Sequence, residues 1–302
     1  ATVNISSNNI QGVAATTYPS TGTIPLIIGG SPGGALNITN NTISNFTMTG
    51  ASGTLRAITA STPTGLYTVT GNTIENLTYS TAGSTGSITG IYNLASATLQ
   101  NINSNIIRNF STPGTGTLNG IQNNTVSGTF QCKTNQIYNF STSAGGAGGF
   151  SANGIIWSNA TVEISGNQIY SINSTGTTGG TGGSINGIAV SGSSNIFGNK
   201  IFDISSASSL PAVNGISITS GTAHSIYNNL IGDLRATAAT SGLTDIIRGL
   251  SVTSTATSST INASFNTIYL NATSSGASFS TSGVYHTTST TATTAALSLR
   301  NN

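Results

Sequence analysis

Two acidic residues have a spacing that could bring their carboxyl groups together. Asp203 and Asp233 each lie four residues after an asparagine that recurs through the chain, so they occupy equivalent positions in adjacent repeats. In a stacked β repeat, such positions lie about 4.8 Å apart. Two carboxyl groups at that distance can raise one pKa, share a proton or hold a cation such as calcium. Alternatively, both replace asparagine in a polar column, with Arg235 and Lys200 nearby as compensating charges.

The remaining groups with catalytic or metal-binding chemistry form no recognisable site by spacing. The other acids fall in unrelated positions of distant repeats: Glu75, Glu163 and Asp245. His224 occupies an otherwise apolar column and is expected at the edge of the core, and Cys132 occupies a column of isoleucines and is expected inside it. Neither a Ser-His-Asp arrangement nor a zinc-ligand spacing is present. We therefore assign no catalytic residue and no cofactor, apart from calcium at Asp203 and Asp233.

Three aromatic residues in successive repeats could form a binding surface. Tyr138, Tyr170 and Phe202 each lie three residues after the recurrent asparagine and next to an isoleucine, so they are expected to point outward. A row of rings at the repeat spacing can stack on sugar rings or anchor a protein partner. The alternative is that β propensity and cover by a neighbouring loop explain the row.

The composition limits the classes of partner. Only 4% of the 302 residues are charged, against roughly 25% in an ordinary soluble domain, and the formal net charge is +2. So few charges cannot form a basic patch, so we expect no nucleic-acid partner. No apolar run approaches the ~18 residues of a membrane span, so we expect no membrane insertion. Polar positions filled by Ser, Thr and Asn favour a secreted, extracellular protein, which the single cysteine leaves without internal disulfides.

All these residues are positioned by one repeat. Its pattern is Asn-x-Ile-x-Asn-apolar-Ser/Thr, and its first asparagine, here called the marker, recurs at intervals of 30 to 37 residues. The markers are Asn8, Asn41, Asn72, Asn105, Asn135, Asn167, Asn199, Asn229, Asn266 and Asn302. A period of this length is typical of a solenoid in which each repeat forms one coil.

Apolar columns in register with the marker predict short strands. Isoleucine stands two residues after every marker from Asn8 to Asn266, mostly apolar residues stand three before it, and a Gly-Ile pair or its equivalent follows later in most repeats. Alternation around these positions predicts three strands per coil. Frequent glycine and the lack of charged i,i+4 pairs disfavour helix. We therefore predict an all-β solenoid of about nine coils.

The marker is expected to sit at a corner between two strands, in the left-handed conformation that asparagine tolerates. Stacked asparagine side chains can bond to one another and to the backbone of the next coil, forming a ladder. The predicted ladder comprises Asn41, Asn72, Asn105, Asn135, Asn167, Asn199, Asn229 and Asn266. A second polar column, four residues after the marker, comprises Asn45, Asn76, Asn109, Asn139, Ser171, Asp203 and Asp233.

These ladders and isoleucine columns resemble the right-handed parallel β-helix repeat family, the pectate-lyase-like solenoids, over nearly the whole chain. The composition is also similar to β-helical regions of large secreted surface proteins of Bacteroidetes-type bacteria. Many β-helix families are polysaccharide lyases or glycoside hydrolases. However, the motifs that polygalacturonase-like enzymes cluster, Asp-Asp, Gly-His-Gly and Arg-x-Lys, do not occur in this sequence.

We expect residues 1–302 to form a single β-helix within a longer array, since both ends fall in the same phase of the repeat and neither shows a cap. The expected role is structural and adhesive: part of a surface protein, stalk or filament that binds polysaccharide or a surface protein through loops and the aromatic row. Two alternatives are a polysaccharide lyase or glycoside hydrolase on this scaffold and a fibre subunit that stacks end to end through uncapped coils.

Overall fold

The computed structural model describes residues 2–13, 17–30, 33–61, 65–125, 128–143, 150–158, 160–176, 183–209, 212–239, 246–254, 256–272, 274, 280–287 and 295–302. Within these ranges the chain is all β, with 30 strands in three parallel sheets and no helix. Since the described residues form no helix, they contain none that could cross a membrane.

Each sheet collects one strand from each successive coil. Sheet A contains β1 (Thr2–Ser6), β5 (Ala35–Thr39), β8 (Leu66–Thr70), β11 (Leu99–Asn103), β14 (Thr129–Lys133), β17 (Val162–Ser165), β20 (Ser194–Phe197), β23 (Ala223–Tyr227), β27 (Thr260–Ser264) and β30 (Ala296–Arg300). Sheet B contains β2 (Asn9–Gln11), β6 (Thr42–Met48), β9 (Thr73–Tyr79), β12 (Ile106–Thr112), β15 (Gln136–Thr142), β18 (Gln168–Ser174), β21 (Lys200–Ser206), β24 (Leu230–Gly232) and β28 (Thr267–Tyr269), with β3 (Thr17–Tyr18) and β25 (Leu234–Ala236) pairing beside them. Sheet C contains β4 (Thr23–Gly29), β7 (Thr54–Ser61), β10 (Ser87–Leu94), β13 (Leu118–Asn123), β16 (Ala152–Trp157), β19 (Ser184–Val190), β22 (Ala212–Ile218), β26 (Ile247–Val252) and β29 (Thr281–His286).

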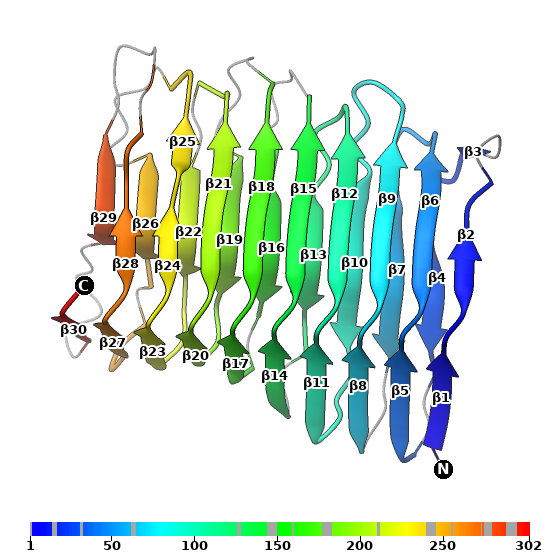
Figure 1. Cartoon of the computed structure of the whole chain (residues 1–302), viewed down its shortest axis with the longest axis horizontal. Coiled ribbons are helices and arrows are strands. Elements are labelled where there is room, and N and C mark those ends of the chain that lie inside the picture. The colour runs from blue at the N-terminus through cyan, green and yellow to red at the C-terminus, as the bar shows by residue number, and fades with distance from the viewer. Residues whose placement is uncertain are drawn as a thin grey trace.

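The chain winds in a right-handed sense. In Figure 1, sheets A and B run upward on the near side and sheet C runs downward behind them, while successive turns advance to the left. Neighbouring strands pair in parallel, and equivalent repeat positions face each other, as Ile137 faces Ile169 and Ile169 faces Ile201. The predicted fold, a parallel β-helix with three strands per coil, is confirmed.

The core is the interior of the coil, and the isoleucine column after the marker fills its centre. These side chains are fully buried from Ile43 to Ile231, and each contributes roughly 1.5 to 3 kcal/mol of transfer free energy. Sheet C approaches this column closely. A Cβ on Gly154 would lie 2.5 Å from Cγ2 of Ile169 and 2.6 Å from the Gly187 carbonyl oxygen. Glycine at this position therefore lets sheet C pack directly on the isoleucines.

The left-handed residues correct one expectation. The markers do not take a positive φ; the residue before each one does, and this column comprises Ser7, Asn40, Gly71, Ser104, Thr134, Gly166, Gly198, Asn228, Phe265 and Asn301. The prediction of a left-handed marker is wrong because the marker must aim its backbone N–H and its side chain along the stacking axis. The preceding residue makes the corner instead. The second polar column is also left-handed, with φ between 50° and 64° from Asn45 to Asp233.

Candidate functional site

The marker asparagines form the predicted ladder. Oδ1 of Asn167 accepts from the backbone N and from Nδ2 of Asn135, both at 2.9 Å. Nδ2 of Asn167 donates to the Cys132 carbonyl oxygen and to Oδ1 of Asn199, also at 2.9 Å. The pattern of a side chain bonded to both neighbouring coils holds for Asn41, Asn72, Asn105, Asn135, Asn167, Asn199, Asn229 and Asn266. Because their bonding capacity is used within the fold, these amides are structural.

The predicted aromatic row lies on the outer face of sheet B, on β15, β18 and β21. The rings of Tyr138 and Tyr170 stack with centroids 4.7 Å apart and planes 4° apart, and those of Tyr170 and Phe202 stack at 5.0 Å and 1°. Each ring face is thus turned toward the next ring rather than toward solvent. The rings form a column that presents its edges outward, and its ligand binding stays a prediction.

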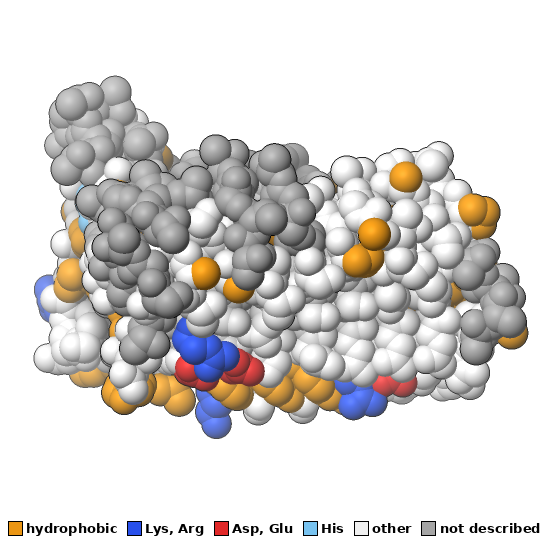
Figure 2. Space-filling view, turned by 90° about the horizontal axis from the view of Figure 1, so that it is seen from above, with side chains coloured by type: hydrophobic (Ala, Val, Ile, Leu, Met, Phe, Trp, Pro, Cys, Tyr) orange, Lys and Arg blue, Asp and Glu red, His pale blue; other side chains and the backbone are white. Residues whose placement is uncertain are grey.

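The two ends of this aromatic column differ. Beyond Tyr138, Arg108 donates from Nη1 to the tyrosine hydroxyl at 2.9 Å and from Nη2 to Glu75 at 2.6 Å. These hydrogen bonds, first that to Tyr138 and then that to Glu75, raise the pKa of Arg108. Beyond Phe202, the equivalent position in the next coil is occupied by Gly232. In Figure 2, hydrophobic side chains follow the lower edge of the molecule, between clusters of charged ones.

The structure brings Asp203 and Asp233 together around a guanidinium group. Arg235 pairs with Oδ1 of Asp203 through Nη2 and with Asp233 through Nη1 at 2.8 Å. The Ser171 hydroxyl, which precedes Asp203 in the second polar column, donates to Oδ2 of Asp203 at 2.5 Å. A calcium ion would have to displace Arg235, so calcium binding here stays a prediction that the observed contacts do not favour. Elsewhere Lys133 pairs with Glu163 at 2.9 Å, while Asp245 lies outside the described residues.

His224 and Cys132 are both buried, as their positions in apolar columns predict. His224 is 2% exposed, its Nδ1 lies 2.8 Å from the Ser194 hydroxyl oxygen, and burial lowers its pKa. Cys132 is fully buried, and burial raises the pKa of its thiol, so the thiolate is disfavoured. Within the described part of the chain, no three His, Cys, Asp or Glu residues are grouped as metal ligands.

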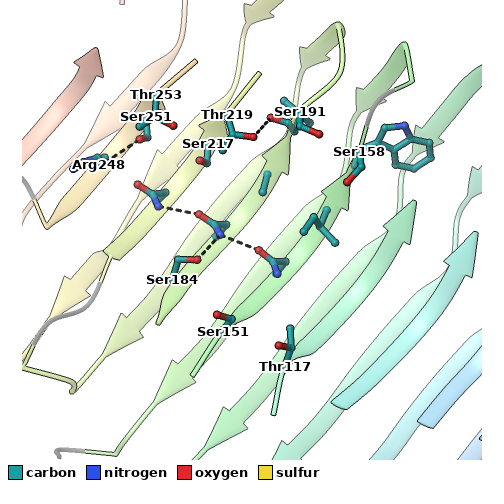
Figure 3. Close-up of a pocket in the computed structure, with 17 residues that line it drawn as sticks. Thr117, Ser151, Ser158, Ser184, Ser191, Ser217, Thr219, Arg248, Ser251 and Thr253 are labelled. Carbon is teal, nitrogen blue, oxygen red and sulfur yellow. Dashed lines mark hydrogen bonds between the residues drawn. The ribbon is translucent and has the colours of Figure 1, made fainter. Parts of the chain in front are cut away.

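A groove that the sequence did not predict lies on the outer face of sheet C. It crosses β16, β19, β22 and β26, reaches Thr117 just before β13, and has a volume of about 540 Å³, within the ~300–1,000 Å³ range of small-molecule sites. Figure 3 shows hydroxyl side chains along both sides, with a row of amides between them. The hydroxyl side chains are Thr117, Ser151, Ser158, Ser184, Ser191, Ser217, Thr219, Ser251 and Thr253. Among the described lining residues, Arg248 is the only charged one.

The floor of this sheet C groove is a third amide row. Nδ2 of Asn153 donates to Asn119, Asn186 to Asn153 and Asn214 to Asn186, at 2.8 to 2.9 Å. The row ends at Oδ1 of Asn214, which is buried and has no hydrogen-bond partner among the described residues. Nε1 of the buried Trp157, which also lines the groove, is unpaired in the same sense. The acceptor of Asn214 is therefore left for a ligand, whereas the Trp157 ring packs edge-on against Phe130 in the core.

The sequence contained a signal for this third row. Each of its four asparagines precedes the Gly-Ile pair of the third strand, so Asn-Gly-Ile recurs four times in succession, at residues 119–121, 153–155, 186–188 and 214–216. The isoleucine of each triplet lies in the core, and the preceding asparagine faces the opposite side of the sheet.

Large side chains lie beyond both ends of the groove. On the amino-terminal side, the outer face of sheet C carries Tyr92, with Arg56 3.6 Å above its ring. At the carboxyl-terminal side Arg248 lies 3.7 Å from the centroid of Tyr285 and donates to Ser251 at 3.3 Å. In the coils between these two ends, the side chains in register with Tyr92 become smaller, ending with Ala189 and then a serine. The hollow is therefore made by small side chains at adjacent coils.

No protein-family model, curated protein or solved structure matches this chain. The resemblance to known proteins therefore extends as far as the parallel β-helix architecture, which the hydrogen-bonded ladders and sheets establish. The candidate site rests on the geometry of the sheet C groove itself.

Proposed function

We propose that this chain is a rigid β-helical part of an extracellular surface protein, stalk or filament, and that it binds a neutral oligosaccharide in the sheet C groove without cleaving it. The observation that carries the proposal is the buried, unpaired Oδ1 of Asn214 in a groove lined by hydroxyls and amides. A buried acceptor without a partner costs about 1–3 kcal/mol. A ligand that donates a hydroxyl to it recovers that energy.

The lining chemistry supports a sugar over other ligands. Hydroxyl and amide groups both donate and accept hydrogen bonds, as do sugar hydroxyls. Because Arg248 is the only described charge in the lining and is engaged with Ser251 and Tyr285, the groove offers little to a strongly charged ligand. The apolar side chains of Ile156 and Ala189 offer a surface on which the C–H faces of the sugar can pack.

The extracellular and structural role is supported by the scaffold. Polar positions rich in Ser, Thr and Asn, with 4% charged residues, are similar to the secreted bacterial surface repeats named above. The continuous ladder from Asn41 to Asn266 joins neighbouring coils through buried hydrogen bonds. Such a body suits a spacer that presents binding surfaces along its length.

An enzymatic role on the same scaffold has no specific observation in its favour. The four described acids are all ion-paired, and none lines the groove. Glycoside hydrolysis needs two carboxyl groups about 5–9.5 Å apart across the scissile bond. We therefore propose binding rather than cleavage, and the test includes analysis of the products.

The test is a screen of neutral and charged glycans, followed by titration of the hits while the fluorescence of Trp157 is recorded. The chain contains one tryptophan, and it lines the groove, so its emission reports on that site. We expect a neutral oligosaccharide to change the emission, and Asn214→Leu to weaken binding at least tenfold.

Asn37→Leu is the matched control, because Asn37 also donates to an asparagine of the adjacent coil, Asn4 at 2.8 Å, but on an exposed part of sheet A. Its affinity should equal that of wild type. Binding that is unaffected by Asn214→Leu, or no binding by any glycan, would contradict the proposal. Cleavage of the bound sugar would replace it with the enzymatic alternative.

A further inference from the structure

The aromatic column on sheet B is interrupted by one coil and then resumes. Ile201 pairs with Ile231, and Ile231 with Ile268. The residues that follow them, Phe202, Gly232 and Tyr269, therefore share one outward position in three consecutive coils. The strands that carry these residues, β21, β24 and β28, are adjacent in Figure 1. Because Gly232 has no side chain, the middle position leaves a gap between the two aromatic residues.

The size of this gap matches one aromatic ring. Aligned aromatic residues in adjacent coils stack at nearly one spacing here: 4.7 Å for Phe110 and Phe140, and 4.8 Å for Phe197 and Tyr227. Two coil steps separate the positions of Phe202 and Tyr269, which is about 9.6 Å. A ring inserted above Gly232 would therefore lie about 4.8 Å from each neighbour, within the ~4.5–7 Å range of stacked aromatic pairs.

The walls of the gap are open to a ligand. Phe202 is 38% exposed and Tyr269 is 63% exposed, although a column of this kind buries its ring faces wherever it is continuous. A Cβ built on Gly232 meets nothing closer than the Tyr269 carbonyl oxygen at 3.4 Å, so the floor is unobstructed. By contrast, Arg108 closes the other end of the column.

The sides of the gap indicate the charge of the ligand. Leu230, which is 46% exposed, lies two residues before Gly232, and Asp233 directly follows it. The carboxylates of Asp203 and Asp233 are paired with Arg235, and Lys200 is the register partner of Leu230. The two acids and two bases around the gap sum to zero, so no net charge draws an ion to it.

We propose that the space above Gly232, between Phe202 and Tyr269, binds one planar, uncharged aromatic ring. The ring completes the column, with a face on each wall and its edge toward solvent. Two sources carry this chemistry: an aromatic side chain of a partner protein, or a free aromatic compound. The site is independent of the sheet C groove, and the failure of either proposal leaves the other standing.

The experiment uses fluorine NMR with the probe N-acetyl-5-fluorotryptophanamide, whose signal has no background from the protein. We expect line broadening with a dissociation constant in the millimolar range for one stacked ring. Gly232→Phe fills the gap from within and should weaken binding at least tenfold. Gly232 does not have a positive φ, so this variant should fold, and its added stacking should raise the Tm.

Controls separate this site from other exposed rings and identify the source of the ligand. Tyr227→Ala removes a ring stacked on Phe197 in sheet A and should leave probe binding unchanged, whereas Phe202→Ala should weaken it. Tighter binding of a short peptide that contains the fluorinated tryptophan points to a protein partner, and equal binding points to a free compound. Probe binding that is absent from wild type, or retained in Gly232→Phe, would overturn the proposal.

Discussion

Two of the asparagine columns in this molecule have opposite outcomes. At the corner between sheets A and B, the side chain of Asn167 makes four hydrogen bonds, and both of its polar atoms are paired. On the outer face of sheet C, the row through Asn153 and Asn186 ends at an unpaired oxygen on Asn214. The same residue type, repeated at the same coil spacing, gives a closed network in one region and an open one in the other.

The difference shows how a repeat can separate scaffold from site. The corner asparagine bonds to the backbone of the preceding coil as well as to its neighbour, so each coil satisfies the next. The outer asparagines bond to their neighbours in the row and to two nearby side chains, with Asn119 donating to Gln122 at 3.0 Å and Asn186 to the Ser184 hydroxyl at 3.4 Å. Because the row lies over a hollow rather than a core, its hydrogen-bonding capacity is available to a ligand.

The largest effect is expected from Asn167→Leu. The leucine removes four buried hydrogen bonds: those that the Asn167 side chain makes with the backbone N and Nδ2 of Asn135, with the Cys132 carbonyl and with Oδ1 of Asn199. At about 1 kcal/mol or more for each, the free energy of unfolding should fall by about 4 kcal/mol. Urea unfolding followed by circular dichroism measures it. A loss below about 1 kcal/mol would show that the corner is no more closed than the outer row.

A smaller loss is expected from Asn186→Leu, the matched variant in the outer row. It removes one acceptor from Asn214 and one donor from Asn153, both side-chain groups beside a groove that water can enter. The expected cost is about 1–2 kcal/mol, in the same urea experiment. A cost equal to that of Asn167→Leu would erase the distinction between the two regions.

Much of this fold is predictable because its main constraint is periodic. Buried isoleucines and bonded asparagines recur in register, since every coil must match the one below it. The left-handed corner was misplaced because the residues there are of mixed type, such as Ser104, Thr134 and Gly166, which share only a backbone conformation. A column defined by φ has no compositional signature.

The candidate site was harder to predict because it depends on what is missing. The groove lies where the residues in register become smaller, from Tyr92 to Ala189 and Ser217. This loss of side-chain volume leaves the repeat pattern of the sequence unchanged. Likewise, the row of Tyr138, Tyr170 and Phe202 followed from spacing, but the direction of the ring planes depends on rotamers that spacing does not determine.

His224, which is buried in sheet A, should make the stability of the protein depend on pH. Burial lowers the pKa of this histidine below its ordinary value of 6.5, although the nearby backbone of Ser220 and Gly221 opposes the shift. Between the two pKa values the unfolded chain binds the proton and the folded chain does not, so stability falls as pH drops. The loss should begin near pH 6.5 and level off below the folded-state pKa.

The measurement is urea unfolding at a series of pH values between 8 and 4, with His224→Leu as the control. The variant should lose the step that begins near pH 6.5, because it lacks the buried imidazole. The effect should be smaller than that of Asn186→Leu, because a single group titrates. An unchanged step in the variant would assign it to another residue.

The smallest effect on stability is expected from Asn214→Leu, at the open end of the outer row. The substitution removes the bond from Nδ2 to Asn186, which costs about 1 kcal/mol, and it also removes a buried unpaired oxygen whose penalty is about 1–3 kcal/mol. The two terms oppose each other, so the unfolding free energy should change by less than about 1 kcal/mol, although glycan binding is lost. If Asn214→Leu instead costs as much as Asn186→Leu, the oxygen of Asn214 is already satisfied without a ligand. The outer row would then be closed like the marker ladder, and the groove above it would have no unpaired acceptor to bind a sugar.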